Sequence, residues 1–161
     1  MTPVRRKKAA GDRPVEILLI EDIPDDARRT IRALRRGSDP CRVRVVEDGE
    51  QALSLLRARA YRPDLILLDW YLPKKAGREV LDEIKSDPEL RMVPIVVLTT
   101  SDRQEDVAAA YDRHANSFVT KPVDAAQFGR AMKLIEIFWK GRTGGSVGVP
   151  ASASSKRKGL R

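Results

Sequence analysis

The run Leu65–Leu68, followed directly by Asp69, is the sequence feature that most constrains the fold. Four consecutive apolar residues between segments with helical periodicity predict a strand that is buried on both faces, as in a parallel sheet. Functional sites of open α/β sheets lie outside the carboxyl ends of their strands, and Asp69 stands at such an end. From this run alone, Asp69 is either a functional group or a turn cap ahead of Pro73, since aspartate is common in turns.

Four further runs predict strands, and a helical pattern follows each of them. Helix starts are indicated by Pro24, by Asp48 with Gly49 and by Asp124. Strict alternation with short connections implies right-handed crossovers and a parallel sheet with helices on both faces, which is an α/β, doubly wound fold. The charge and valine alternation at 42–46 indicates an edge strand. The expected strands are 15–20, 42–46, 65–69, 95–99 and 117–120.

The net charge of +8 is carried by the two ends of the 161-residue chain rather than by its centre. Basic segments without periodicity predict a disordered tail over residues 1–14 and a flexible tail over residues 141–161. Residues 15–140 form the expected folded domain, which is slightly acidic without the tails. A basic fold that binds nucleic acid is therefore not indicated, and residues 141–161 are too short and irregular to form a DNA-binding domain.

The composition also limits the compartment. The single Cys41 excludes an internal disulfide. No apolar run approaches the ~18 residues of a membrane span, and no apolar region follows the basic N-terminus as in a signal peptide. We therefore expect a cytoplasmic protein without a membrane partner.

Charged and hydroxyl side chains mark the ends of the predicted strands. Glu21 and Asp22 follow the first strand, Asp69 and Thr99 close the third and fourth, and Lys121 follows the fifth. Parallel strands end at one edge of a sheet, so we expect one site. Like charges ~4 Å apart repel by about 4 kcal/mol at a protein surface, so the carboxylates favour a divalent cation such as Mg²⁺ or Mn²⁺. Beside such a cation Asp69 can act as a nucleophile towards phosphorus, with Lys121 and Thr99 contacting the phosphoryl oxygens.

This ordered set resembles the receiver domain of two-component response regulators. The resemblance covers residues 15 to about 139, and the set with its spacings is far more specific than any one tripeptide. It implies a flavodoxin-like (βα)5 sheet of strand order 2-1-3-4-5, Mg²⁺-dependent phosphotransfer from a histidine kinase to Asp69, and slow self-catalysed loss of that phosphate. The segments that carry it are Ile20-Glu21-Asp22, Leu67-Leu68-Asp69, Leu98-Thr99-Thr100 and Val119-Thr120-Lys121-Pro122.

A narrower resemblance is to the small stand-alone regulators that partner bacterial phytochromes. It rests on residues 72–81, 94–101 and 114–116. It implies a histidine kinase of the bacteriophytochrome type as partner, and signalling through protein contacts rather than specific DNA binding.

The receiver resemblance assigns a role to each strand-end residue. The implied assignments are phosphoacceptor Asp69, phosphate contact Lys121, metal ligands Glu21, Asp22, Asp69 and the backbone carbonyl of Tyr71, and switch residues Thr99 and Phe118. Glu21 replaces the more common aspartate, and Phe118 replaces the more frequent tyrosine. Tyr71 stands at a position that is often small and polar, so its ring is expected to affect the access of water and hence the phosphate lifetime.

The predicted last helix has an apolar face that is wider than the sheet can cover. The residues concerned are Leu134, Ile137, Phe138 and Trp139. One interpretation is a wide core face. The other, which we favour, is a homodimer or partner surface formed by helix 4, strand 5 and helix 5, because exposed aliphatic and aromatic surface marks interfaces.

Two other functions remain open from the sequence. An unphosphorylated scaffold or polyanion binder would act through the basic tails, since clustered cations bind phosphate groups. A small phosphohydrolase with an aspartyl nucleophile would use a similar sheet. Such enzymes usually carry a second acid two residues after the nucleophile, where this chain has Tyr71.

Overall fold

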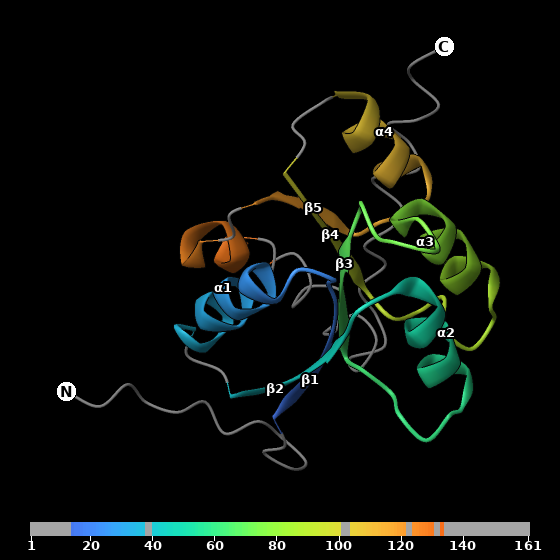
Figure 1. Ribbon diagram of the computed structural model, residues 1–161, viewed down its shortest axis with the longest axis horizontal. Helices are drawn as coiled ribbons and strands as arrows, with labels where there is room; N and C mark the ends of the chain where they lie inside the picture. Colours follow the sequence, from blue (N-terminus) through green and yellow to red (C-terminus); the bar gives the residue numbers. More distant parts are fainter. Residues whose placement is uncertain (1–13, 38–39, 101–103, 122–123, 131–132, 134–161) are drawn as a thin grey trace, which may run out of the picture.

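The computed structural model describes residues 14–37, 40–100, 104–121, 124–130 and 133, and a five-stranded parallel sheet forms its centre. The strand order is β2-β1-β3-β4-β5, and every neighbouring pair is parallel (Figure 1). The predicted flavodoxin-like order 2-1-3-4-5 is confirmed, with β2 at an edge. The strands are β1 (Val15–Ile20), β2 (Cys41–Val46), β3 (Leu65–Asp69), β4 (Ile95–Thr99) and β5 (Ser117–Thr120).

Helices connect the strands at the predicted places. They are α1 (Pro24–Arg35), α2 (Gly49–Arg57), α3 (Gly77–Ser86) and α4 (Gln104–Asp112), and residues 125–130 are helical after β5. Asp48 caps α2 by accepting a hydrogen bond from the amide of Gln51 at 2.8 Å, and Asp124 accepts one from the amide of Gln127 at 2.7 Å. None of the helices in the described ranges combines the length and the apolar character of a membrane span.

Two apolar clusters cover opposite faces of the sheet. One lies beneath α2, α3 and α4 and contains Leu18 and Leu68. The other lies beneath α1 and residues 125–130 and contains Leu19 and Leu67. Figure 1 shows α1 on one side of the sheet and α2 and α3 on the other. Since β3 and β4 are buried along their whole length, they appear in the sequence as unbroken apolar runs, and their predicted bounds are confirmed.

The start of α3 lies against the end of β3. The amide of Gly77 donates a hydrogen bond to the carbonyl oxygen of Trp70 at 3.1 Å. A Cβ atom at position 77 would lie 2.5 Å from the carbonyl oxygen of Asp69, so this approach requires glycine. Within the connection Lys74 has a φ of 65°, in the left-handed region. The β3–α3 connection is therefore held close to the strand end that carries the Asp69 carboxylate.

Lys85 on α3 is half-buried, and the fold partly shields its amino group from water. Its Nζ donates hydrogen bonds to the carbonyl oxygens of Arg91 at 3.1 Å and Val93 at 3.3 Å. Burial lowers the pKa of Lys85 from 10.5 to about 8. Between these two pH values the unfolded chain binds more protons than the folded one, so the free energy of unfolding rises with pH in that interval.

We expect the wild-type protein to gain stability relative to Lys85→Met as the pH rises from about 8 towards 10.5. The difference in slope should be roughly 1 kcal/mol per pH unit, measured by urea unfolding at fixed pH values. The variant also loses two hydrogen bonds, which changes its free energy of unfolding by the same amount at every pH. The difference in slope against pH, rather than the difference in stability, therefore tests the pKa. Parallel curves over this interval would contradict a depressed pKa.

Candidate metal and phosphorylation site

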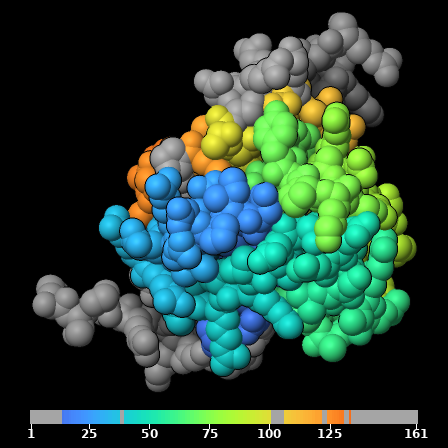
Figure 2. Space-filling model, viewed as in Figure 1, coloured from blue at the N-terminus to red at the C-terminus, as the bar shows by residue number. Residues whose placement is uncertain are grey.

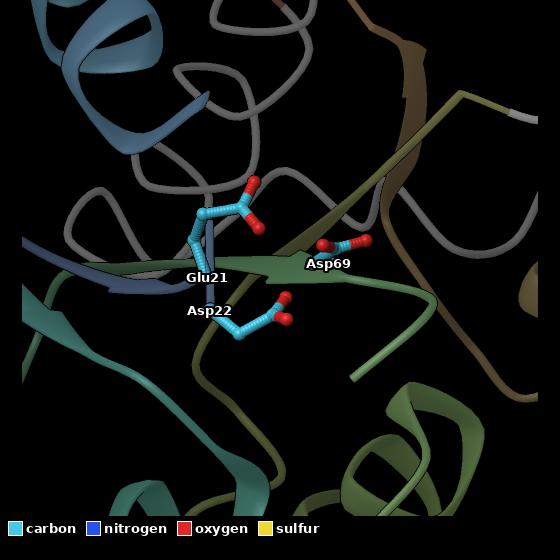
Figure 3. A group of neighbouring side chains, drawn as sticks. All are labelled: Glu21, Asp22 and Asp69. Atoms are coloured by element: carbon cyan, nitrogen blue, oxygen red, sulfur yellow. The ribbon is translucent and has the colours of Figure 1, made fainter. Parts of the chain in front are cut away.

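Carboxylates meet at the edge of the sheet where the parallel strands end. Glu21 and Asp22 follow β1 directly, and Asp69 is the last residue of the neighbouring strand β3. One carboxylate oxygen of each acid lies within 4.8 Å of those of the other two, and the three groups turn towards a common space (Figure 3). Since β1 lies between β2 and β3, the acids stand where the winding of the chain reverses, the usual place of a site in such a sheet.

The ammonium group of Lys121 supplies the counter-charge. Its Nζ donates hydrogen bonds to the carboxylates of Glu21, of Asp26 at 3.1 Å and of Asp69 at 3.1 Å. The side chain of Lys121 is only 7% exposed, so these ion pairs are poorly screened by water. The amide of Lys121 donates to the carbonyl oxygen of Thr99 at 2.7 Å, which holds the residue beside the end of β4. The predicted strand-end residues are thus brought together by backbone pairing.

Asp26 is a member of this cluster that the sequence did not reveal. It lies in the first turn of α1, where an acid is readily explained by the helix dipole. In the structure Asp26 contacts Lys121, whereas its neighbour Asp25 pairs with Arg28 and is exposed. The position of Asp26 in the sequence could have indicated its role, because the first turn of the helix after β1 lies at the same sheet edge as the site. Sequence alone does not tell which of the two adjacent acids faces inward.

The cluster shifts the pKa values of its members. Burial, together with Asp69, raises the pKa of Glu21 to about 8, although Lys121 acts in the opposite direction. Burial by itself lowers the pKa of Lys121, but Glu21 and Asp69 outweigh it and raise that pKa to about 12. Lys121 is therefore held charged, but its single positive charge does not neutralise all of the carboxylates around it.

Asp22 carries the best indication that the site fits a divalent cation. Its Oδ1 is buried and has no hydrogen-bond partner within the described ranges, which is costly for an acceptor of this kind. Carboxylate oxygens alone suit Mg²⁺ or Mn²⁺ rather than metals that prefer thiolate or imidazole. The residues present therefore fit such an ion, with Glu21, Asp22 and Asp69 as the groups that would hold it. The backbone carbonyl of Tyr71 as a further ligand stays a prediction.

The predicted switch residues lie on adjacent strands. Thr99 closes β4 and is fully buried, while Phe118 on β5 is half-buried and pairs with Val97. Side chains alternate along a strand, so Thr99 and Val97 project to the same face. Phe118 packs against the cluster beneath α2, α3 and α4, which places both switch candidates on the α4 side of the sheet. Their movement on phosphorylation stays a prediction.

Tyr71 connects the site to α4. Its amide donates a hydrogen bond to Oδ1 of Asp69 at 3.1 Å, and its phenol hydroxyl donates one to Oδ2 of Asp106 at 2.5 Å. The sequence singled out Tyr71 as unusual but did not indicate Asp106, since only the packing of α4 brings that carboxylate within reach.

The proposed dimer residues are not part of the described structure. Leu134, Ile137, Phe138 and Trp139 lie outside it, as does Pro122. The described part of the last helix contributes Phe128 to the cluster beneath α1. The dimer surface therefore stays a prediction.

Residues 17–133 match the family of the response regulator receiver domain, a span that includes every acid of the site and Lys121. The chain belongs to this receiver family. Membership agrees with the observed strand order and with the resemblance of the strand-end residues. Proteins of this family are generally signalling proteins.

Three relatives of this receiver domain are informative. Response regulator Rcp1 of Synechocystis sp. (strain ATCC 27184 / PCC 6803 / Kazusa) is 40% identical over 131 residues, which are 78% of this chain and 89% of Rcp1. The phosphorylated cyanobacterial phytochrome response regulator RcpA is 46% identical, with a TM-score of 0.66 over 79% of this chain and 94% of RcpA. The bacteriophytochrome response regulator RtBRR is 41% identical, with a TM-score of 0.71 over 79% of this chain and 81% of RtBRR.

Solved structures of these relatives contain a phosphoryl group or a divalent metal ion, the two groups expected at this site. RcpA is phosphorylated in its structure. Rcp1 has been solved in an Mn²⁺-bound form, which is 37% identical to this chain with a TM-score of 0.64, over 86% of this chain and 100% of the solved one. The acidic cluster of this receiver domain offers oxygen donors for the same class of ion.

We expect Asp22→Asn to raise the free energy of unfolding in EDTA by about 1 kcal/mol, because it removes one of the repelling charges from the cluster. With millimolar Mg²⁺ the wild type should be the more stable of the two, since metal binding stabilises it and stabilises the variant much less. Urea unfolding in the two buffers measures both effects.

Asp25→Asn is the matched control for this experiment. Asp25 is a neighbouring acid in the first turn of α1, but it is exposed and pairs with Arg28. Its stability should respond to Mg²⁺ as the wild type does. An equal response to Mg²⁺ in Asp22→Asn and the wild type would show that Asp22 is not a ligand.

Proposed function

We propose that this protein is a phosphoacceptor switch of a two-component system, in which Asp69 receives a phosphoryl group from a histidine kinase. The observation that carries the proposal is the 3.1 Å contact between Lys121 and the Asp69 carboxylate, beside Glu21 and Asp22. A nucleophile, a cation for phosphoryl oxygens and a set of metal ligands then act together. Membership of the receiver family supports the same reaction.

In the proposed transfer, a carboxylate oxygen of Asp69 attacks the phosphorus atom of a phosphohistidine. The P–O bond forms as the P–N bond breaks, and the released imidazole takes up a proton. Asp69 is oriented in advance, because Oδ2 accepts a hydrogen bond from Lys121 and Oδ1 accepts one from the amide of Tyr71. Lys121, with a pKa of about 12, stays charged and neutralises phosphoryl oxygens. A bound Mg²⁺ or Mn²⁺ would add Lewis-acid stabilisation, and the same site would slowly return the phosphate to water.

The proposed output is a change in the surface on the α4 side of the sheet. Phosphorylation replaces the single negative charge of the Asp69 carboxylate with a phosphoryl group that carries about −1.5 to −2. We propose that the Thr99 hydroxyl then moves to a phosphoryl oxygen and that Phe118 moves inward behind it. Phenylalanine has no hydroxyl to satisfy on burial, so the movement leaves no polar group unpaired. The signal then passes by protein contact rather than by specific DNA binding.

A phytochrome-type histidine kinase is the proposed partner. The similarity of this protein to RcpA and RtBRR supports this choice. We place the exchange in the cytoplasm, with a receiver domain over residues 15–140 acting as a stand-alone regulator. Residues 1–14 and 141–161 are proposed to be its basic tails.

Asp69→Asn should take up no phosphate from acetyl phosphate in the presence of Mg²⁺, because the amide offers no nucleophilic carboxylate oxygen. The wild-type protein should be labelled, as measured by intact mass. Asp25→Asn, an exposed acid at the same end of the sheet, should be labelled as the wild type is. Labelling of Asp69→Asn at the wild-type level would show that another residue accepts the phosphate.

We also propose a homodimer through the α4, β5 and last-helix face. Ile137→Glu should raise the dimer dissociation constant at least ten-fold, because a charge placed in an apolar interface loses its hydration. Sedimentation equilibrium with and without acetyl phosphate measures this. Lys133→Gln, a change at an exposed position four residues earlier in the chain, is the control and should leave the constant unchanged. A wild-type protein that is monomeric at all concentrations in both states would rule out the dimer.

A further inference from the structure

Tyr71 is held at both ends, and its two partners belong to different parts of the molecule. Its amide donates to the carboxylate of Asp69 at 3.1 Å, so the backbone is fixed to the phosphorylation site. Its phenol donates to Asp106 on α4 at 2.5 Å. The β3–α3 connection, in green, and α4, in gold, adjoin at one end of the molecule (Figure 2). Tyr71 as a whole is 54% exposed, so apolar burial contributes little to holding its side chain.

α4 is an element that one hydrogen bond can influence. Among residues 106–112, Ala110 alone is fully buried, and its methyl side chain offers little apolar area. By contrast α2 buries Leu53 and Leu56, and α3 buries Leu81 and Ile84. A helix anchored by so little apolar surface opens at low free-energy cost, so a single bond of ordinary strength matters there.

The charge at Asp69 acts directly on the Tyr71 connection. An ionised carboxylate is a strong acceptor for the Tyr71 amide, and its conversion to an acyl phosphate removes that charge from the carboxyl oxygens. The added phosphoryl group also places negative charge at the end of the Tyr71 connection that lies opposite the carboxylate of Asp106. Both effects favour displacement of Tyr71 away from Asp106.

We propose that the Tyr71–Asp106 hydrogen bond is a latch that holds α4 to the β3–α3 connection while Asp69 is unmodified, and that phosphorylation releases it. Tyr71 is then a positioning residue that makes the mobility of α4 depend on the state of Asp69. The release step rests on the proposed function, whereas the latch itself does not. By linkage, in a variant without the latch the mobility of α4 no longer depends on phosphorylation of Asp69.

Hydrogen exchange of residues 106–112, followed by mass spectrometry on the full chain without phosphodonor, tests the latch. Tyr71→Phe removes only the hydroxyl, and Asp106→Ala removes the acceptor. Each should speed exchange in α4 by about five-fold, as expected for loss of one hydrogen bond, and the double variant should add little more. The double-mutant comparison also cancels any effect of Asp106 on the dipole of α4.

Two matched variants on α4 serve as controls. Tyr111→Phe removes an exposed phenol hydroxyl, and Asp112→Ala removes an exposed carboxylate. Neither residue is the acceptor of the Tyr71 phenol, which is Asp106, so the exchange of α4 should change less than two-fold in Tyr111→Phe. In Asp112→Ala any change should add to that of Tyr71→Phe, in contrast to Asp106→Ala. Additive effects of Tyr71→Phe and Asp106→Ala, or wild-type exchange in Tyr71→Phe, would overturn the latch.

The same measurement with acetyl phosphate and Mg²⁺ tests release. Wild-type α4 should exchange several-fold faster once Asp69 is labelled, whereas Tyr71→Phe should exchange fast in both states. A phosphorylation response in Tyr71→Phe equal to that of the wild type would reduce Tyr71–Asp106 to a structural contact and overturn its coupling role. If wild-type Asp69 takes up no phosphate, the proposed function and the release step fail together, while the first experiment still decides whether the latch exists.

Discussion

The ion-pair cluster around Lys121 is the interaction on which the functional edge of this protein depends. One ammonium group contacts the carboxylates of Glu21, Asp26 and Asp69, and so joins β1, α1, β3 and the end of β5. Glu21 and Asp69 are nearly inaccessible to water, so these two carboxylates could not be tolerated together without a cation. Lys121 neutralises part of their charge, and what remains is the attraction that the site offers to a divalent metal ion.

Such a cluster needs a rigid support, which the parallel sheet supplies. β3 and β4 are buried on both faces, and the two apolar clusters leave the strand ends little freedom to move apart and relieve the repulsion. Gly77 adds to this support, because it lets α3 begin against the carbonyl of Asp69. Local unfavourable electrostatics at the strand ends are thus offset by apolar packing elsewhere, a common arrangement at functional sites.

The elements around the site differ in how firmly they are held. α2 and α3 are anchored by leucine and isoleucine side chains, whereas α4 relies on alanines and on polar contacts such as that of Tyr71 with Asp106. Regions that respond to a ligand or modification are drawn from the less stable parts of a fold. The side of the sheet that carries Thr99 and Phe118 is also the side of α4, so the switch candidates and a helix with little apolar anchoring share one face.

Much of this architecture is determined by local sequence. Burial on both faces requires apolar runs, so β3 and β4 have the bounds that the sequence predicted. The residues at the strand ends had to share one edge once all strands were parallel. The sequence also predicted the metal donors Glu21, Asp22 and Asp69 as neighbours, and the structure brings them together. These features follow from periodicity and from strand direction, both of which are properties of a short segment.

Other features were decided only by the tertiary structure. Asp26 rather than Asp25 contacts Lys121, Asp22 keeps a buried oxygen without a partner in the described chain, and Tyr71 reaches Asp106. The contacts of Asp26 and Tyr71 depend on how α1 and α4 are rotated and packed against the sheet, and on distances between residues far apart in the chain. Periodicity identifies the buried face of a helix but not its angle or height over a strand. Contacts of a few ångströms between polar groups were therefore settled by the packing of the two layers and not by the order of residues alone.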